Sequence, residues 1–278
     1  MRVAVTGASG FVGRHAVRAL RSRGVEVIAL SRTSPTCVEN GVVYAPFDLA
    51  GVGSDAFARI GEPDVLLHLA WGGLPNYRST THLEHELPMQ AGFLEHALRG
   101  GLRRVVVTGT CLEYGLREGE LVESMAPAPH VAYAAAKDAL HGRLRALREE
   151  LGFGLGWLRL FYLYGDGQAQ TSLYRQLRAA IESGARRFAM SRGDQMRDFL
   201  AIEVAAGMLA DLAIGHADAG VVNVCSGRPM TVADTVQGWL REWRADLELD
   251  LGALPYADYE PFAFWGSTRR LDALLETR

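Results

Sequence analysis

The chain has 278 residues, of which 49% are apolar and 22% charged, and its formal net charge is −3. This composition supplies enough apolar side chains for a packed core and excludes disorder as the main state. The weak negative charge, without a long basic run, argues against nucleic acid or an anionic membrane as the main partner. No apolar run approaches 18 residues, so no membrane span is expected.

The N-terminal segment and the cysteines indicate the cellular location of the protein. The segment Met1–Gly7 has too short an apolar run for a signal peptide and continues directly into a glycine motif. Cys37, Cys111 and Cys225 are odd in number and far apart, which predicts neither a disulfide framework nor a metal site. A cytoplasmic, reducing location is therefore expected.

Over the first 160 residues, short β-branched runs alternate with helical patterns. Strands that are apolar on both faces are typical of a parallel sheet covered by helices on each side. The predicted fold class is therefore α/β, a Rossmann-type doubly wound parallel sheet. The expected strands are Val3–Thr6, Val25–Leu30, Val42–Ala45, Val65–Leu69, Val105–Thr108 and Leu155–Leu163, and the expected helices are Val12–Arg23, His82–Arg99 and Ala132–Leu151.

After Gly165 the alternation weakens. We predict a dinucleotide-binding domain over residues 1–165 and a smaller substrate lobe over residues 166–278, with some later elements returning to the main sheet. The end of the chain, with Pro255 and Pro261, is expected to be irregular. The expected elements of this part are helices Ser172–Ser183 and Ala201–Ile214, a loop Ser191–Arg197 and a strand Val221–Val224.

A glycine motif, TGASGFVG at residues 6–13, follows the first strand and opens the first helix. Small residues allow a tight turn and close approach of the backbone to a pyrophosphate, and the helix N-terminus supplies free N–H groups. The spacing is G-x-x-G-x-x-G, not the usual G-x-G-x-x-G, and glycines alone are also consistent with a structural turn. The strand–turn–helix context favours a dinucleotide cofactor.

The residues at the end of the second strand indicate whether the cofactor is NAD or NADP. An acid there would bind the ribose hydroxyls of NAD, whereas an arginine would accommodate the 2′-phosphate of NADP. The strand ends in Ser31 and Arg32 without an acid, so NADP is preferred and NAD is the alternative; Arg32 is otherwise a surface residue. Asp48, after the third strand, is placed to contact the adenine end or to cap a helix.

Tyr133 and Lys137 lie four residues apart on a predicted helix, so both project from one face. A free tyrosine has a pKa of about 10, and a neighbouring ammonium group favours its phenolate. The pair is thus suited to moving a proton between a carbonyl and an alcohol. Thr110, at the end of the fifth strand, offers a hydroxyl to the substrate oxygen or caps a turn.

Together these motifs resemble the extended short-chain dehydrogenases, the NAD-dependent epimerase/dehydratase family that acts on nucleotide sugars, over nearly the whole chain. Gly7, Gly10 and Gly13 match the family's phosphate loop, and Thr110, Tyr133 and Lys137 match its catalytic residues. Segments His68–Ala70, Arg159–Gly165, Arg197–Phe199 and Asn223–Gly227 also resemble family motifs, although Tyr162 stands where the family usually has Asn.

This resemblance completes the predicted site. The cofactor residues are Gly7, Ser9, Gly10, Phe11, Val12, Gly13, Ser31, Arg32, Asp48, Leu49, Leu69, Ala70, Trp71, Thr108, Tyr133, Lys137, Phe161 and Leu163. The substrate residues are Trp71, Gly72, Thr110, Cys111, Leu112, Tyr162, Arg197 and Asn223, with Arg197 on the diphosphate. Trp71, Tyr77 and His82 either line the sugar pocket or serve only to pack against other side chains.

Departures from the family narrow the implied reaction. The family's 4,6-dehydratases have Asp-Glu after the catalytic Thr, where this chain has Cys111 and Leu112. Neither side chain is a carboxylic acid–base, and Cys111 is out of register with the catalytic Cys of the GDP-fucose synthase type. The galactose-type 4-epimerases usually carry an acid after the second strand, which is missing here. Ketone reduction or its reverse remains, most like the dTDP-4-keto-6-deoxyhexose reductases.

Three hypotheses follow. The first is an NADPH-dependent reductase of a nucleotide-linked 4-keto-6-deoxy sugar, with dTDP as the expected nucleotide. The second is a nucleotide-sugar epimerase with tightly bound NAD. The third is a non-catalytic NAD(P)-sensing regulator, although such proteins often lose the Tyr or the Lys. By resemblance, a homodimer paired through the helices His82–Arg99 and Ala132–Leu151 is expected.

Overall fold

A seven-stranded parallel sheet forms the centre of the molecule, which is described by a computed structural model covering residues 1–33, 40–256 and 260–277. Its strand order is β11-β7-β5-β4-β1-β2-β3, and all neighbouring pairs are parallel. The predicted fold class is thereby confirmed. The strands are β1 (Arg2–Thr6), β2 (Glu26–Ser31), β3 (Val42–Pro46), β4 (Val65–His68), β5 (Arg104–Thr110), β7 (Gly154–Leu160) and β11 (Gly220–Val224).

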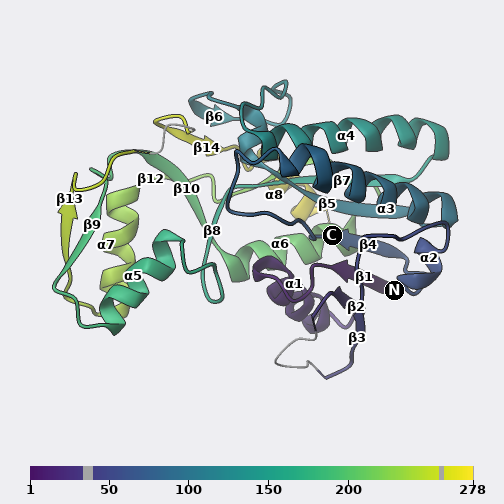
Figure 1. Cartoon of the computed structure of the whole chain (residues 1–278), viewed down its shortest axis with the longest axis horizontal. Helices are drawn as coiled ribbons and strands as arrows, with labels where there is room; N and C mark the ends of the chain where they lie inside the picture. Colours follow the sequence, from purple (N-terminus) through teal and green to yellow (C-terminus); the bar gives the residue numbers. More distant parts are fainter. Residues whose placement is uncertain (34–39, 257–259, 278) are drawn as a thin grey trace.

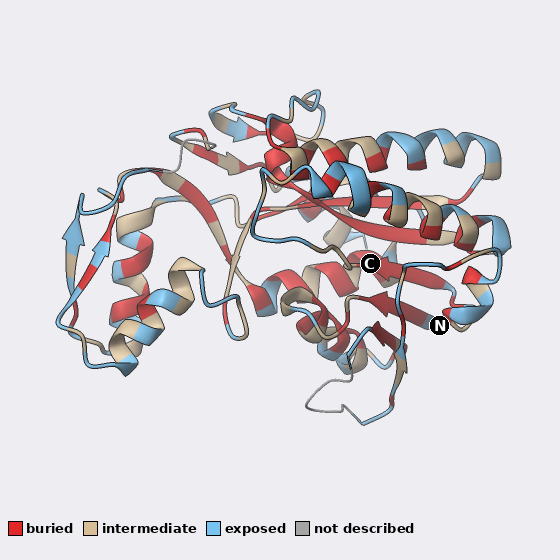
Figure 2. Cartoon of the chain, viewed as in Figure 1, coloured by how far each residue is buried: buried red, intermediate tan, exposed pale blue. Residues whose placement is uncertain are grey.

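Helices cover both faces of this sheet (Figure 1). On one face, α1 and α6 pack against each other over a core that includes Leu20 and Leu209. On the other face, α3 and α4 enclose a second core around Phe93 and Leu140. The strands between the layers are mostly buried (Figure 2), except the edge strand β3. The helices are α1 (Phe11–Ser22), α2 (Ala56–Arg59), α3 (Leu87–Gly100), α4 (Ala132–Leu151), α6 (Ile202–Gly215) and α8 (Arg269–Glu276).

A smaller lobe lies to the left in Figure 1 and has its own core around Leu177 and Trp239. It is built from small sheets of order β12-β10-β8 and β13-β9, while β14-β6 forms a further pair over the main body. The strands are β6 (Gly119–Leu121), β8 (Tyr162–Tyr164), β9 (Arg187–Met190), β10 (Met196–Ala201), β12 (Pro229–Thr231), β13 (Glu248–Leu251) and β14 (Phe264–Gly266), with helices α5 (Leu173–Glu182) and α7 (Val232–Trp243). The division near residue 165 stays a prediction, and β11, α6 and α8 lie with the main sheet.

Four local predictions differ from the structure. The expected strand Leu155–Leu163 is two strands, because the N–H of Phe161 bonds to the carbonyl of Val224 and β8 then pairs with β10. The expected helix His82–Arg99 begins as a π-helical turn, η1 (His82–Glu86), before α3. The chain end is irregular only in part: the described residues around Pro255 and Pro261 lie in no named element, but β14 and α8 follow them. The expected loop Ser191–Arg197 also ends earlier, where β10 begins.

The carboxyl ends of the parallel strands converge on one edge of the sheet. β1, β4 and β5 end there in Thr6, His68 and Thr110, and α1 begins at the same edge. In open α/β sheets this edge is where ligands bind, at the point where the strand order reverses. In the described residues no helix is long and apolar enough to cross a membrane.

Candidate active site

The glycine motif forms a tight cradle between β1 and α1. Gly7 has φ of +68°, and a Cβ there would lie 2.9 Å from the amide N of Ala70. A Cβ on Gly13 would overlap the carbonyl O of Gly7, so the strand and the helix can approach only without a side chain. The N-cap residue Gly10 makes no side-chain cap, and the first turn holds no acid. The free N–H groups of α1 therefore fit a dinucleotide pyrophosphate.

A buried histidine joins the strand ends beneath this cradle. His68 Nδ1 lies 2.8 Å from Thr6 Oγ1, and Nε2 lies 2.7 Å from Gln90 Oε1. Gln90 donates through its amide N to Glu86, so its Oε1 is the acceptor and His68 Nε2 carries the proton. Burial and the Lys137 charge lower the pKa of His68 to about 3. His68 is therefore neutral and rigid, and sequence analysis assigned it no role.

Two cavities extend from the cradle. The larger, of about 530 Å³, runs along the ends of β1, β2 and β3, and the smaller, of about 290 Å³, faces α4. Leu69 and Trp71 border both, so the two cavities adjoin. The larger includes the predicted residues Gly7, Ser9, Gly10, Ser31, Arg32, Asp48, Leu49, Ala70 and Gly72. The smaller includes Phe11, Val12, Thr108, Thr110, Cys111, Leu112, Tyr133, Lys137, Phe161, Tyr162 and Leu163.

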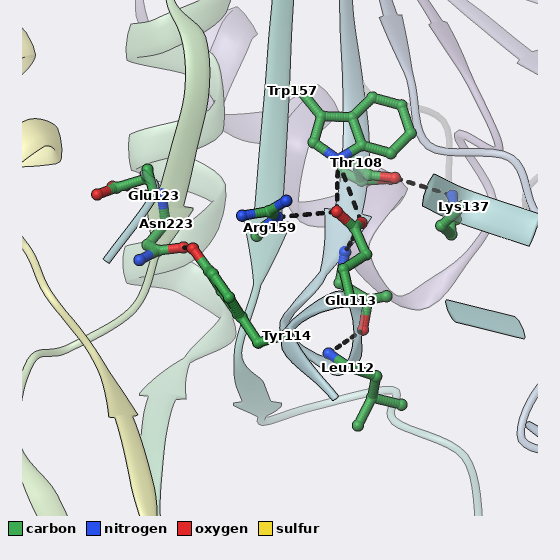
Figure 3. A network of polar contacts seen from close by, with 10 residues as sticks. Thr108, Leu112, Glu113, Tyr114, Glu123, Lys137, Trp157, Arg159 and Asn223 are labelled. Carbon is green, nitrogen blue, oxygen red and sulfur yellow. Dashed lines mark hydrogen bonds and ion pairs between the residues drawn. The ribbon is translucent and has the colours of Figure 1, made fainter. Parts of the chain in front are cut away.

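Lys137 lies fully within this smaller site. Its Nζ donates a 2.8 Å hydrogen bond to the carbonyl O of Thr108 (Figure 3) and lies 4.0 Å from the centre of the Trp71 ring. Burial lowers the pKa of Lys137 to about 7, and the carboxylates of Glu113 and Glu86 oppose that change. The ammonium form is thus held by a carbonyl, an indole face and two negative charges.

Tyr133 lies one helical turn before Lys137 and is also buried. Burial is the main cause that raises its pKa, with contributions from Tyr77, Glu113 and Cys111, while a hydrogen bond with the Thr110 side chain lowers it. The expectation that the Lys137 ammonium would favour the phenolate is therefore wrong for this structure, because burial dominates the pKa of Tyr133. The phenol is protonated at neutral pH and bonded to the predicted threonine. In this state Tyr133 is a proton donor.

An aromatic wall surrounds Tyr133. The ring centres of Trp71, Tyr77 and His82 lie 5.9, 5.6 and 5.3 Å from that of Tyr133. Trp71 and Tyr77 line the cavity, whereas His82 is buried behind them. His82 accepts a 3.2 Å hydrogen bond from Trp71 Nε1 and lies 2.9 Å from the carbonyl of Asn76. His82 therefore holds the loop that forms this wall.

Two predicted substrate residues do not reach the cavity. Arg197 is 2% exposed and is held by the carbonyls of Met196 and Phe262. Its Nε and Nη2 donate to Glu260 at 3.3 and 2.9 Å, and Glu260 lies on the cavity wall in front of it. An anionic ligand would have to replace Glu260 to meet Arg197. Glu260 follows no recognisable motif, so the sequence did not indicate it.

Asn223 lies away from both cavities, inside a buried polar network (Figure 3). Its Oδ1 accepts the Tyr114 hydroxyl at 2.7 Å, its Nδ2 donates to the carbonyl of Leu121, and its peptide N donates to Glu123. Both ends of the side chain are therefore used within the fold. Gly13 likewise packs on Gly7 and borders neither cavity.

The chain is similar to known proteins in its sequence and in its fold. A sequence model described as the NAD dependent epimerase/dehydratase family matches residues 3–225. The chain is 26% identical over 273 residues to the dTDP-6-deoxy-L-talose 4-dehydrogenase (NAD(+)) of Aggregatibacter actinomycetemcomitans, covering 96% of this chain and 100% of that protein.

Two solved structures are similar over almost the whole chain. MoeE5 in complex with UDP-glucuronic acid and NAD is 26% identical, with a TM-score of 0.84 and coverage of 99% of this chain and 93% of that one. TunA, an NAD-dependent NDP-hexosamine 5,6-dehydratase, is 24% identical, with a TM-score of 0.85 and coverage of 99% and 91%. The second likeness establishes a shared fold only.

Proposed function

Because the chain belongs to the NAD-dependent epimerase/dehydratase family, we propose that it modifies a nucleotide sugar, as an NAD(P)H-dependent reductase of a nucleotide-linked 4-keto-6-deoxy sugar. The similarity to a dehydrogenase that acts at position 4 of a dTDP-linked 6-deoxy sugar supports this reading. Reduction of the 4-keto sugar is the reverse of that reaction. A dTDP-linked substrate is proposed on the same ground.

The acid–base groups of the cavity carry the proposal. Burial raises the pKa of the Cys111 thiol, so it is not a thiolate base. Glu260, the one carboxylate among the described residues of the wall, is paired with Arg197. Tyr133, next to Thr110 and Lys137, is thus the group to which we assign the proton transfer. One proton donor suffices for ketone reduction, whereas dehydration needs a further acid–base residue.

The residues of the chain would divide the reaction as follows. When bound, the nicotinamide cofactor supplies the hydride. Tyr133 donates its phenolic proton to the ketone oxygen as that oxygen gains electrons, and Thr110 steadies the phenol and the forming alkoxide. The Lys137 ammonium balances the resulting phenolate until a proton from solvent restores the phenol. The aromatic wall excludes water from this step.

We propose NADPH as the preferred reductant because of Arg32. The described residues at the end of β2, Ser31 to Thr33, contain no carboxylate, and Arg32 borders the larger cavity. A guanidinium there can hold a 2′-phosphate with two parallel hydrogen bonds. The named dehydrogenase uses NAD(+) and MoeE5 was solved with NAD, so NADH is the alternative.

The second candidate is a nucleotide-sugar epimerase, since Thr110, Tyr133 and Lys137 would serve a transient oxidation equally well. The relative YtcB of Bacillus subtilis, named an uncharacterized UDP-glucose epimerase, is 23% identical over 257 residues. An epimerase would retain tightly bound NAD and show no net redox change. We also propose a homodimer that pairs α3 and α4. A monomer mass by light scattering would contradict this dimer.

The test follows nicotinamide absorbance after the protein is mixed with dTDP-4-keto-6-deoxyglucose and either NADPH or NADH. Loss of absorbance that disappears in Tyr133→Phe supports the reductase, and the faster cofactor decides the role of Arg32. Turnover that persists in Tyr133→Phe contradicts the mechanism. No absorbance change with either cofactor, together with NAD that copurifies with the protein, favours the epimerase.

A further inference from the structure

A carboxylate lies buried directly behind the reacting groups. Glu113, in the 3₁₀ turn η2 (Cys111–Tyr114), is 0% exposed. Its Oε1 accepts the peptide N–H of Thr110 at 2.9 Å, and Trp157 Nε1 donates to its two oxygens at 3.1 and 3.0 Å. Arg159 Nε donates to Oε2 at 2.8 Å (Figure 3). Burial raises the pKa of Glu113, while the Arg159 charge and the bonds from Arg159, Thr110 and Trp157 oppose that change. Because each of these contacts is a donor that only a carboxylate oxygen can accept from on both sides, we assign the group as a carboxylate.

Glu113 connects the turn that carries Thr110 to the neighbouring strand. Thr110 and Glu113 form a capping box, in which the Thr110 hydroxyl accepts the N–H of Leu112 at 3.3 Å. A capping box alone is a local device for the start of a helical turn. Here two side chains of β7, Trp157 and Arg159, hold the same carboxylate, so the position of Thr110 depends on the packed sheet.

The charge of Glu113 also faces the catalytic pair. It raises the pKa of Lys137, as Glu86 does from η1, against the larger effect of burial. It raises the pKa of Tyr133 as well, in the same direction as burial, Tyr77 and Cys111 and against the Thr110 hydrogen bond. Of the described residues, His82 and Lys137 also lie near the phenol. Loss of the Glu113 charge would therefore lower both pKa values.

Burying this charge is hard to explain by stability alone, because a well-packed apolar pair often serves a fold as well as a buried ion pair. We propose that Glu113 is a positioning residue of the active site, which fixes the Thr110 backbone so that its hydroxyl meets Tyr133 and sets the negative potential behind Lys137. This role rests on the proposed function of Thr110, Tyr133 and Lys137.

The first test reads the charge without any substrate. Lys137 is the only lysine in the sequence, so protein labelled with [13Cε]lysine gives a single lysine side-chain NMR signal. We expect wild type to titrate near the pKa of about 7 and Glu113→Gln to titrate lower, by roughly half to one pH unit. The control is Tyr114→Phe, which removes the 2.7 Å bond to Asn223 from the same network and leaves the carboxylate intact.

The second test reads the positioning through turnover. Glu113→Gln should lower kcat by about 10- to 100-fold with KM within about twofold, and should move the alkaline limb of the pH profile to lower pH. Glu113→Asp keeps the charge but is one methylene shorter, so kcat should fall while the Lys137 signal stays at the wild-type pKa. Circular dichroism and the thermal midpoint check that each variant folds.

The outcomes separate the two proposals. A folded Glu113→Gln with wild-type kcat and an unmoved Lys137 signal would overturn the positioning role and leave Glu113 as a structural cap. If Glu113→Gln does not fold, Trp157→Phe removes one donor to the carboxylate, and unchanged kcat there overturns the role as well. If wild type reduces no keto sugar, the proposed function fails, whereas the Lys137 titration still decides the electrostatic part.

Discussion

Acid should destabilise the fold through one buried histidine beneath the cofactor cradle. His68 is 0% exposed, and its ring is bonded at both nitrogens, to Thr6 and to Gln90. Burial, and then the Lys137 charge, lower its pKa from 6.5 to about 3, and the Gln90 hydrogen bond only partly opposes this. Protonation of the folded state would put a second proton at Nδ1, where Thr6 donates.

The size of the effect follows from linkage. Between pH 6.5 and about pH 3 the unfolded chain binds this proton and the folded chain does not, so stability falls as the pH falls. The His68 contribution is complete above pH 6.5 and decreases by about 1.4 kcal/mol per pH unit below it. At pH 5.0 the loss amounts to about 2 kcal/mol.

The assay is urea unfolding of wild type and His68→Gln at pH 7.0 and 5.0. Glutamine stays neutral and offers an acceptor and a donor of similar reach, so it serves as the matched control. Burial also lowers the pKa of His141 to about 4. Protonation of His141 and of the carboxylates changes the free energy of unfolding equally in both proteins. Wild type should lose about 2 kcal/mol more than the variant between the two pH values; equal losses would refute the reasoning.

Three further predictions concern ligands. Thr110→Ala should lower kcat about 100-fold with KM nearly unchanged in steady-state kinetics, because it removes a partner of the Tyr133 phenol; an equal rise in KM would speak against this. Arg32→Ala should reduce kcat/KM for NADPH by at least about tenfold and leave NADH unaffected. Glu260→Gln should tighten dTDP binding about tenfold by calorimetry, because it frees Arg197 for the diphosphate; unchanged affinity would place Arg197 outside the substrate site.

Much of the main sheet could be predicted because its signals are local. Continuous β-branched runs that alternate with amphipathic segments allow few arrangements other than a doubly wound parallel sheet. The helix Ala132–Leu151 was predicted with the boundaries that the structure has. Tyr133 and Lys137 share a face of that helix by its periodicity alone, so their common approach to the cavity was also predictable.

Two features of the smaller lobe were not predicted from the sequence, the start of helix α7 and the separate strand β8. Thr231 accepts the N–H of Asp234, a cap that marks the start of α7, which we did not predict. The run Leu155–Leu163 is apolar throughout, and nothing in its pattern indicates that its last residues pair with β10. A short apolar run has no period that identifies its sheet.

The fold class, the glycine-rich turn and the spacing of the Tyr–Lys pair can be read from the amino-acid sequence alone, because each depends on residues within a few positions of one another. Only the tertiary structure placed Glu113 against Arg159, 46 residues away, and Glu260 against Arg197, 63 residues away. The tertiary structure also places Asn223 away from the cavities, where both ends of its side chain are hydrogen-bonded to Tyr114 and Leu121. Contacts across such separations come from how the layers pack, and neither periodicity nor motif spacing encodes that packing.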